Sequence, residues 1–206
     1  VNLQTLRYHP LVALFAGVVG FSLRNLQVYL LILYGYGAIS CFLLMRQMEI
    51  DRRLAILFGL LYTTSGFALG NASHFPQLHL FLTEPLTLFL MLRFIRSPSA
   101  GRFAGAVAGH CLLVAGGYPS ILGHLMLFNI LFGAVTVVGG QPHGVRASLR
   151  PLLLLGGTFF VSLIVMAPML VPAILSLPHI TRGEPVSYDV FTGNRLPAWN
   201  LYSILN

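Results

Sequence analysis

Charge is what this sequence has least of, and lysine is missing altogether. Only 8% of its 206 residues are charged, whereas 56% are hydrophobic, and the mean hydropathy is +0.82. A soluble domain carries about 25% charged residues. All 12 basic residues are arginines, against 5 acids, which gives a formal net charge of +7. This composition excludes an ordinary soluble domain and indicates a membrane protein.

Cysteine is also scarce, and its placement excludes a disulfide framework. Cys41 and Cys111 each lie inside an apolar run, so we interpret them as small core residues. His110 and His124 have no third ligand at a suitable spacing, so they predict no metal site. No other cofactor is evident, and a divalent metal stays an open alternative. Nucleic acid is not an expected partner, because the basic residues border apolar runs and no aromatic–basic patches occur.

The arginines gather in three short clusters separated by long apolar stretches. Those stretches predict about six transmembrane helices, at residues 28–45, 53–70, 77–95, 103–117, 118–138 and 151–174. If loops 46–53, 96–102 and 139–150 are cytoplasmic, they and Arg93 hold eight of the 12 arginines. The opposite loops at 71–76 and 116–120 then hold none. This distribution satisfies the positive-inside rule for six helices.

The predicted fold is therefore an all-α, polytopic transmembrane bundle in a single membrane domain, with the lipid bilayer as its partner. Residues 1–27 form an external or interfacial segment, because the apolar run at 11–23 is only 13 residues long and too short to cross about 30 Å of hydrocarbon. The helix bundle covers 28–175, and 176–206 form an external loop. Because the chain begins at Val1 and ends without a stop pattern, we expect it to be a fragment of a longer protein.

Small residues and prolines in the apolar runs indicate how the helices pack. Gly101, Gly105 and Gly109 are spaced four apart, a pattern that lets a neighbouring helix approach closely. Pro85 interrupts the third predicted span, and prolines also occur in the last one. Neighbouring helices in a membrane protein can satisfy the backbone groups that proline leaves free.

Four polar residues are candidates for a substrate-binding site. Glu84 lies inside the third span, where a carboxylate is costly unless it is neutralised, paired or facing a water-filled cavity. It is therefore either part of a polar cavity or a protonated or hydrogen-bonded structural residue. His74 and His79 flank the start of the same helix and either act on a proton or phosphate or pack structurally. Arg182, in the external tail, either binds a lipid phosphate or belongs to an ordinary loop.

The order of several short motifs is similar to that of a known family. They are Tyr8-His9-Pro10, Leu43-Leu44-Met45-Arg46, Arg52-Arg53-Leu54-Ala55, Thr64-Ser65-Gly66-Phe67, Gly116-Gly117-Tyr118-Pro119 and residues 201–206 (LYSILN). A central Pro85 and the pair Pro168 and Pro172 also fit the order. The chain resembles, over nearly its whole length, the YfhO-type bacterial polytopic membrane proteins of the GT-C glycosyltransferase superfamily.

The resemblance implies a sugar transferase at the outer face of the bacterial inner membrane. Such enzymes take a sugar from a polyprenyl-phosphate carrier, and their catalytic acid usually lies in the first external loop. No acid precedes Glu49, which is placed inside, so that acid is expected upstream of this chain and the catalytic residue is unknown. Two other classes stay open: a transporter or flippase subunit with Glu84 as the coupling residue, and a non-catalytic membrane scaffold. The sugar, the acceptor and the oligomeric state are not predicted.

Overall fold

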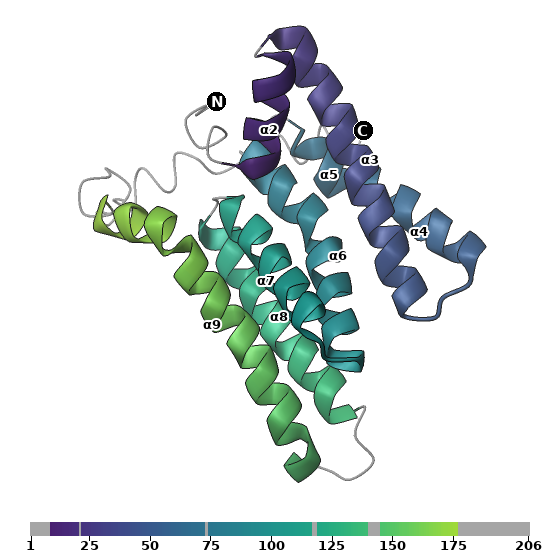
Figure 1. The fold of residues 1–206 in the computed structure, drawn as a ribbon. Helices are drawn as coiled ribbons and strands as arrows, with labels where there is room; N and C mark the ends of the chain where they lie inside the picture. Colours follow the sequence, from purple (N-terminus) through teal and green to yellow (C-terminus); the bar gives the residue numbers. More distant parts are fainter. Residues whose placement is uncertain (1–8, 21, 73, 117–118, 140–144, 177–206) are drawn as a thin grey trace, which may run out of the picture. The chain divides into compact units, whose positions relative to one another are not determined.

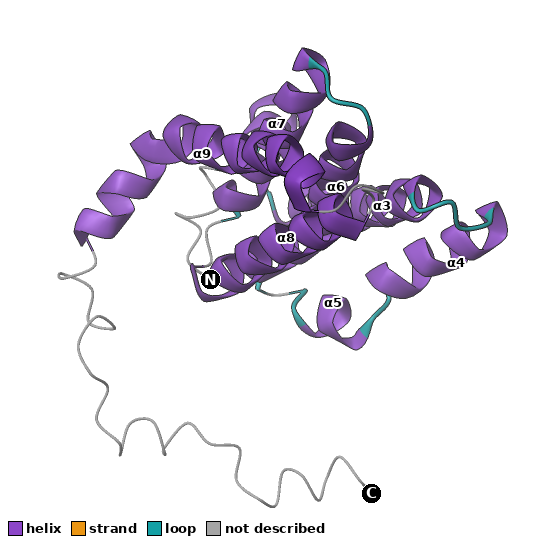
Figure 2. Ribbon diagram, turned by 90° about the horizontal axis from the view of Figure 1, so that it is seen from below, coloured by secondary structure: helices purple, strands orange, loops and turns teal. Residues whose placement is uncertain are grey.

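The computed structural model describes residues 9–20, 22–72, 74–116, 119–139 and 145–176. Within these ranges the regular structure is helical and no strand occurs, which confirms the all-α prediction (Figure 2). The chain divides into two units, Val1–Met166 and Ala167–Asn206. The described part of the second unit is only the final stretch of the last helix, residues 167–176. The helical bundle is therefore a property of the first unit.

The helices follow one another with short connections (Figure 1). They are α2 (Pro10–Val19), α3 (Leu23–Gln47), α4 (Arg52–Thr63), α5 (Gly66–Gly70), α6 (Phe75–Arg96), α7 (Ala100–Ala115), α8 (Pro119–Gly139) and α9 (Val145–Ser176). Four of them begin at a side-chain cap: Ser22, Asp51, Ser65 and Ser99 each accept a hydrogen bond from a backbone N–H in the first turn. Such caps satisfy donors that the first turn leaves unpaired.

In the described part of the chain, five helical segments are long and apolar enough to cross a membrane. They are Arg24–Gln47, Arg52–Gly70, Phe75–Arg96, Ile121–Gly139 and Leu149–Pro172. The fourth predicted span, 103–117, corresponds to α7, whose 16 residues give a length of only about 24 Å. The second span is divided, because the helix breaks at Thr64 and restarts after the Ser65 cap. The short apolar run near the N-terminus is indeed a short helix, α2, of 10 residues.

Helix α6 is the most enclosed of the five candidate spans. It packs against α3, α5, α7 and α8, and 67% of its most apolar window is buried. The corresponding share is 33% for α3 and 17% for α8. Figure 1 shows α6 between α3 and α7, and the contacts agree. The polar side chains in the middle of α6, from His79 to Thr87, are therefore surrounded by protein rather than by lipid.

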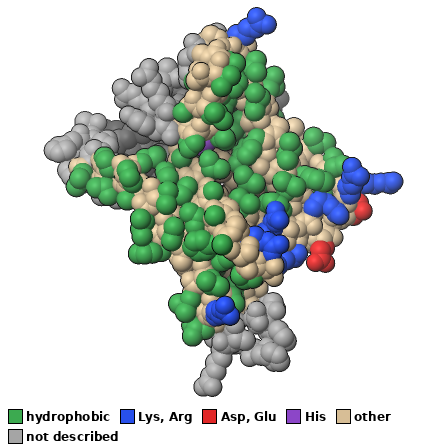
Figure 3. Space-filling model, viewed as in Figure 1, with side chains coloured by type: hydrophobic (Ala, Val, Ile, Leu, Met, Phe, Trp, Pro, Cys, Tyr) green, Lys and Arg blue, Asp and Glu red, His purple; other side chains and the backbone are tan. Residues whose placement is uncertain are grey.

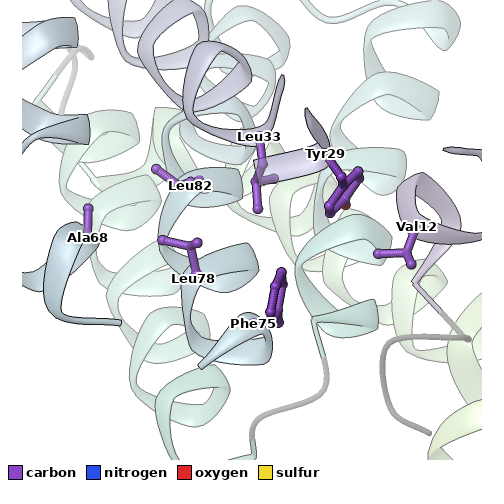
Figure 4. Close-up of a cluster of buried hydrophobic side chains, with 7 residues drawn as sticks. All are labelled: Val12, Tyr29, Leu33, Ala68, Phe75, Leu78 and Leu82. Carbon is purple, nitrogen blue, oxygen red and sulfur yellow. The ribbon is translucent and has the colours of Figure 1, made fainter. Parts of the chain in front are cut away.

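Two clusters of buried apolar side chains hold the bundle on opposite stretches of α6. The first joins α2, α3, α5 and the start of α6, as Figure 4 shows; its buried members are Val12, Tyr29, Leu33, Ala68, Phe75, Leu78 and Leu82. The second joins α3, α6 and α9 through Leu44, Leu88, Met91, Leu92, Leu155 and Phe159. Because lipid is as apolar as these side chains, close packing rather than water exclusion holds them together.

Glycines mark three close helix approaches. A Cβ at Gly59 of α4 would lie 2.7 Å from the Ala38 carbonyl oxygen of α3, so only glycine fits there. A Cβ at Gly133 of α8 would lie 2.6 Å from a Leu155 methyl of α9. The predicted glycine ladder is only partly used: a Cβ at Gly109 would lie 3.3 Å from the Thr87 Cα, whereas Gly101 has open space around it. The prediction was wrong for Gly101, since it lies at the exposed start of α7.

Helix α6 continues through Pro85 because another helix satisfies the carbonyl that proline leaves free. Proline has no N–H, so the carbonyl of Phe81, four residues earlier, lacks its helical donor. The hydroxyl of Tyr62 on α4 donates to that carbonyl. The Tyr62 ring also stacks on the Phe81 ring at 4.2 Å between centroids. Tyr62 therefore ties α4 to α6 beside Glu84.

Two of the three loops with arginines, 46–53 and 96–102, lie at the same end of the bundle. The Arg96 guanidinium at the end of α6 is 3.6 Å from the Glu49 carboxylate in the α3–α4 turn. Hydrophobic side chains cover much of the described surface in view, and most arginines and acids in view gather toward the α3–α4 turn (Figure 3). The Arg96 and Glu49 side chains are both exposed, so their ion pair adds little stability. It does show that 46–53 and 96–102 share one end of the bundle.

Candidate functional site

Polar side chains buried inside this apolar bundle are the candidates for function. They are His9, Ser40, Thr63, His79, Thr83, Glu84, Thr87, His110, Asn129, Thr158 and Ser162. Four of them lie on α6, which makes this helix the polar centre of the first unit. Burying a polar group costs about 2 kcal/mol or more unless it is hydrogen-bonded. The hydrogen bonds of His79 and Glu84 to other helices define two separate clusters.

The first cluster surrounds His79 near the start of α6. The His79 Nδ1 is 2.8 Å from the Phe75 carbonyl oxygen, which can only accept, so Nδ1 carries the proton. The Nε2 atom is then an acceptor, and the Tyr29 hydroxyl of α3 donates to it over 2.5 Å. Both nitrogens of His79 are occupied. As it stands, this imidazole can exchange a proton with Tyr29 but has no free donor for a phosphate.

The ring of His9 completes this cluster. It lies at the start of α2, with its centroid 4.3 Å from that of His79, and it is only 2% exposed. Neither ring nitrogen makes a well-formed hydrogen bond, although the Leu112 carbonyl lies close enough to favour ring protonation weakly. Burial, together with the neighbouring His79, lowers the pKa of His9 to about 3. His9 is therefore neutral at physiological pH.

The second cluster is the pair of Glu84 on α6 and Asn129 on α8. The Asn129 side-chain amide donates to the Glu84 Oε2 over 3.2 Å. Glu84 is 6% exposed and Asn129 is fully buried. The second carboxyl oxygen of Glu84 and the Asn129 Oδ1 have no hydrogen-bond partner among the described residues. Of the two interpretations of Glu84, the hydrogen-bonded one matches this contact.

The structure does not bring all four predicted site residues together. His79 and Glu84 are five residues apart on α6, which turns them about 140° from each other around the helix axis. His79 contacts α3, whereas Glu84 contacts α8. His74 is the exposed residue that precedes α6, about 15 Å along the helix from Glu84. Arg182 lies outside the described residues.

Among the described residues of the first unit, an open apolar groove of about 580 Å³ lies beside α7 and α9. Its lining is Pro10, Phe103, Ala104, Val107, Ala108, Cys111, Leu112, Val161, Val165 and Met166. None of the predicted site residues lines it. Pro10 follows the buried His9, and Leu112 is the residue whose carbonyl lies near the His9 ring. One end of the groove therefore borders the histidine cluster.

Sequence reasoning missed Tyr29, His9 and Asn129 as members of these clusters. Asn129 had a usable signal, since it is a lone amide within a long apolar run, and such residues hydrogen-bond to neighbouring helices. Tyr29 and His9 had no comparable signal, because each resembles an ordinary interfacial residue. Within the ranges that the structure describes, no three His, Cys, Asp or Glu side chains are grouped to hold a metal ion.

The fold and these clusters define a class: a multi-pass helical membrane protein with a polar centre on one buried helix. Comparison with protein-family models, curated proteins and solved structures returns no match to this chain. The function of this chain must therefore be inferred from the contacts and the groove described above.

Proposed function

We propose that this chain is the membrane-embedded part of a transferase that takes a sugar from a polyprenyl-phosphate carrier and places it on a cell-envelope acceptor. The observation that carries the proposal is the apolar groove beside α7 and α9. Its volume of about 580 Å³ falls in the range of ligand sites, roughly 300–1,000 Å³. Its lining is entirely apolar, which suits a segment of isoprenoid chain. The YfhO-like order of motifs supports the same class.

The position of the groove along α7 suggests how such a carrier lies. The lining residues of α7 run from Phe103 to Leu112, a distance of about 14 Å along the helix. The Leu112 end borders His9 and the start of α6, which is also the end with loop 71–76. In this proposal that end faces outward, at the outer surface of the bacterial inner membrane. The carrier phosphate then emerges near loop 71–76.

The polar residues take supporting roles in the proposed transfer. Arg182 binds the carrier phosphate, since a guanidinium suits a phosphate in charge and geometry. His74 and His79 shape the outer polar site, with His79 held in one tautomer by Tyr29 and Phe75. Glu84 supports that site from within the bundle.

The test fills the groove in the intact protein. Val107→Trp and Ala108→Trp place an indole where the isoprenoid chain is proposed to lie, and Leu153→Trp adds the same indole at an exposed position of α9. Envelope glycans from cells that carry each variant are analysed by mass spectrometry, after membrane levels have been matched. We expect loss of the transferred sugar in both groove variants but not in Leu153→Trp. Unchanged glycosylation in both groove variants would refute the proposal.

A second candidate function rests on the Glu84–Asn129 pair. A carboxyl inside a bundle is a frequent coupling residue in transporters, so a transporter or flippase subunit is the alternative. Reconstituted into liposomes with a fluorescent lipid reporter, the intact protein would then move lipid in response to a pH gradient. Glu84→Gln would abolish that movement, whereas the exposed acid variant Glu49→Gln would not. Absence of movement in the wild type removes this candidate.

A further inference from the structure

The hydrogen-bonding capacity of Glu84 and Asn129 does not balance if Glu84 is ionised. The Asn129 amide nitrogen already donates to Oε2, at 3.2 Å. The two oxygens left over, Oε1 of Glu84 and Oδ1 of Asn129, are both buried and both lack a partner. A carboxylate oxygen and an amide oxygen can only accept. One additional proton between them would satisfy both atoms at once.

None of the residues that the structure describes supplies a positive charge that could hold Glu84 as an anion. Apart from the arginines, the buried or half-buried ionisable side chains on the helices around α6 are Tyr29, Tyr34, Tyr36, Cys41, Tyr62, His110 and Cys111. His124 of α8 is exposed. Tyr62 is an electrostatic neighbour of Glu84, and its hydroxyl is engaged with the Phe81 carbonyl. The Nδ1 of His110 is engaged with the Ala106 carbonyl of its own helix.

The arginines of these helices lie at helix ends. Arg24, Arg46, Arg52, Arg53, Arg93 and Arg96 are exposed. Arg102, at the start of α7, is half-buried and donates to the Ser97 carbonyl. An unpaired carboxylate in the interior of a membrane protein costs several kcal/mol. Protonation removes that charge and, in the same step, provides the missing donor.

We propose that Glu84 and Asn129 form a proton-binding site that latches α8 onto α6. A proton from water adds to the Glu84 carboxylate, and the resulting O–H donates to the Asn129 Oδ1. Together with the existing Nδ2–H to Oε2 bond, it closes an acid–amide ring between the two helices. Loss of the proton leaves one hydrogen bond and sets two acceptor oxygens against each other. The site does not depend on the proposed sugar transfer.

The ring adds a second hydrogen bond to the one that already joins α8 to α6. A buried acid–amide pair makes two hydrogen bonds across one helix interface, and each is worth about 0.6 kcal/mol on average inside a membrane protein. Gly133, four residues further along α8, brings the helix close to Leu155 and Met91. The proton site therefore lies in the tightly packed part of α8.

Infrared spectroscopy of the purified intact protein in D₂O tests the proposal directly. A protonated carboxyl has a C=O band that a carboxylate lacks. We expect this band at neutral pH in the wild type, its loss in Glu84→Gln and its retention in Glu49→Gln, which alters an exposed acid. In Asn129→Leu the band should shift to the frequency of a carboxyl without a hydrogen-bond partner. Glu84→Gln keeps the shape of the side chain, and its melting curve verifies folding.

A thermal-melting series separates the proton from other ligands. We expect the wild type to lose stability as the pH rises through the range where the infrared band disappears, and Glu84→Gln to show no such loss. Two results would overturn the proposal. One is a wild-type spectrum without the band at neutral pH, which would mean an ionised Glu84 bound to water. The other is stabilisation of the wild type, but not of Glu84→Gln, by sodium chloride over choline chloride, which would mean a cation in place of the proton.

Discussion

Helices α6 and α8 are both long enough to span a membrane, yet they are built for different surroundings. α6 has four fully or nearly buried polar side chains and 67% of its apolar window buried. α8 has a mean hydropathy of 2.1 in its window, with only 17% buried, and one buried polar side chain, Asn129. Polar residues are retained where neighbouring helices can pair them, and lipid-facing positions are apolar. The more hydrophobic helix, α8, is therefore the less buried of the two, so hydropathy alone does not predict which helix is enclosed by protein.

The largest effect should come from a cavity in α6. Met91→Ala removes a side chain that is fully buried between α3, α8 and α9. We expect a loss of about 2–5 kcal/mol in unfolding free energy, as for other large-to-small core substitutions. Leu127→Ala on α8, where the side chain is 57% exposed, should change it by less than about 0.5 kcal/mol. Equal losses in a detergent or urea unfolding series would contradict the difference between the helices.

A second pair of variants tests the two faces of α8 itself. Gly133→Val forces a side chain against Leu155 and Met91, and overpacking of this kind costs about 1–3 kcal/mol. Gly123→Val, on the same helix, has nothing within 4 Å of its Cβ and should be tolerated. Thermal melting of the two purified variants makes the comparison. A lower melting temperature for Gly123→Val than for Gly133→Val would show that α8 packs through its other face.

Tyr62 of α4 and Pro85 of α6 should be energetically coupled. Tyr62→Phe removes the donor to the Phe81 carbonyl, and we expect a loss of about 1 kcal/mol. Pro85→Ala restores an N–H that can bond that carbonyl within the helix. In the Pro85→Ala background, Tyr62→Phe should therefore be nearly neutral. A double-mutant cycle of unfolding free energies measures the coupling, and strictly additive effects would mean that the hydroxyl has another role.

The smallest effect should be a pH dependence that comes from His9. Because its pKa is about 3 when buried and near 6.5 when exposed, the unfolded chain takes up a proton that the folded chain refuses. Stability is therefore complete above pH 6.5 and falls as the pH drops toward 3. Between pH 7 and pH 6 the loss should be about 0.7 kcal/mol. His9→Phe should remove this acid-side loss; if the slope persists in that variant, another group causes it.

Much of the helical order could be predicted from the sequence, because it depends on properties that lie along the chain. Apolar runs set the spans, serines and Asp51 set helix starts, and the arginine clusters placed loops 46–53 and 96–102 at one end, where the Arg96–Glu49 pair now lies. The break at Thr64 was missed, since the apolar pattern continues across it.

The partners of the site residues could not be predicted, because they are set by helix rotation. Glu84 could be identified as a candidate because a carboxylate inside an apolar span is energetically costly. Nothing along the chain links it to Asn129, 45 residues away. In the same way, His79 and Tyr29 are 50 residues apart and meet only because α3 presents Tyr29 to α6. A rotation of about 100°, one residue, would change every such pair.

Cross-linking between α6 and α8 is the most direct measurement. In the intact protein with Cys41 and Cys111 replaced by alanine, one variant carries Glu84→Cys with Asn129→Cys and another carries Glu84→Cys with Leu127→Cys. A short bifunctional thiol reagent is applied in membranes. We expect an intramolecular cross-link for positions 84 and 129 and none for 84 and 127, because Asn129 faces Glu84 while Leu127 faces outward. A cross-link for the second pair and none for the first would contradict α6 as the buried polar centre that α8 packs against through Asn129.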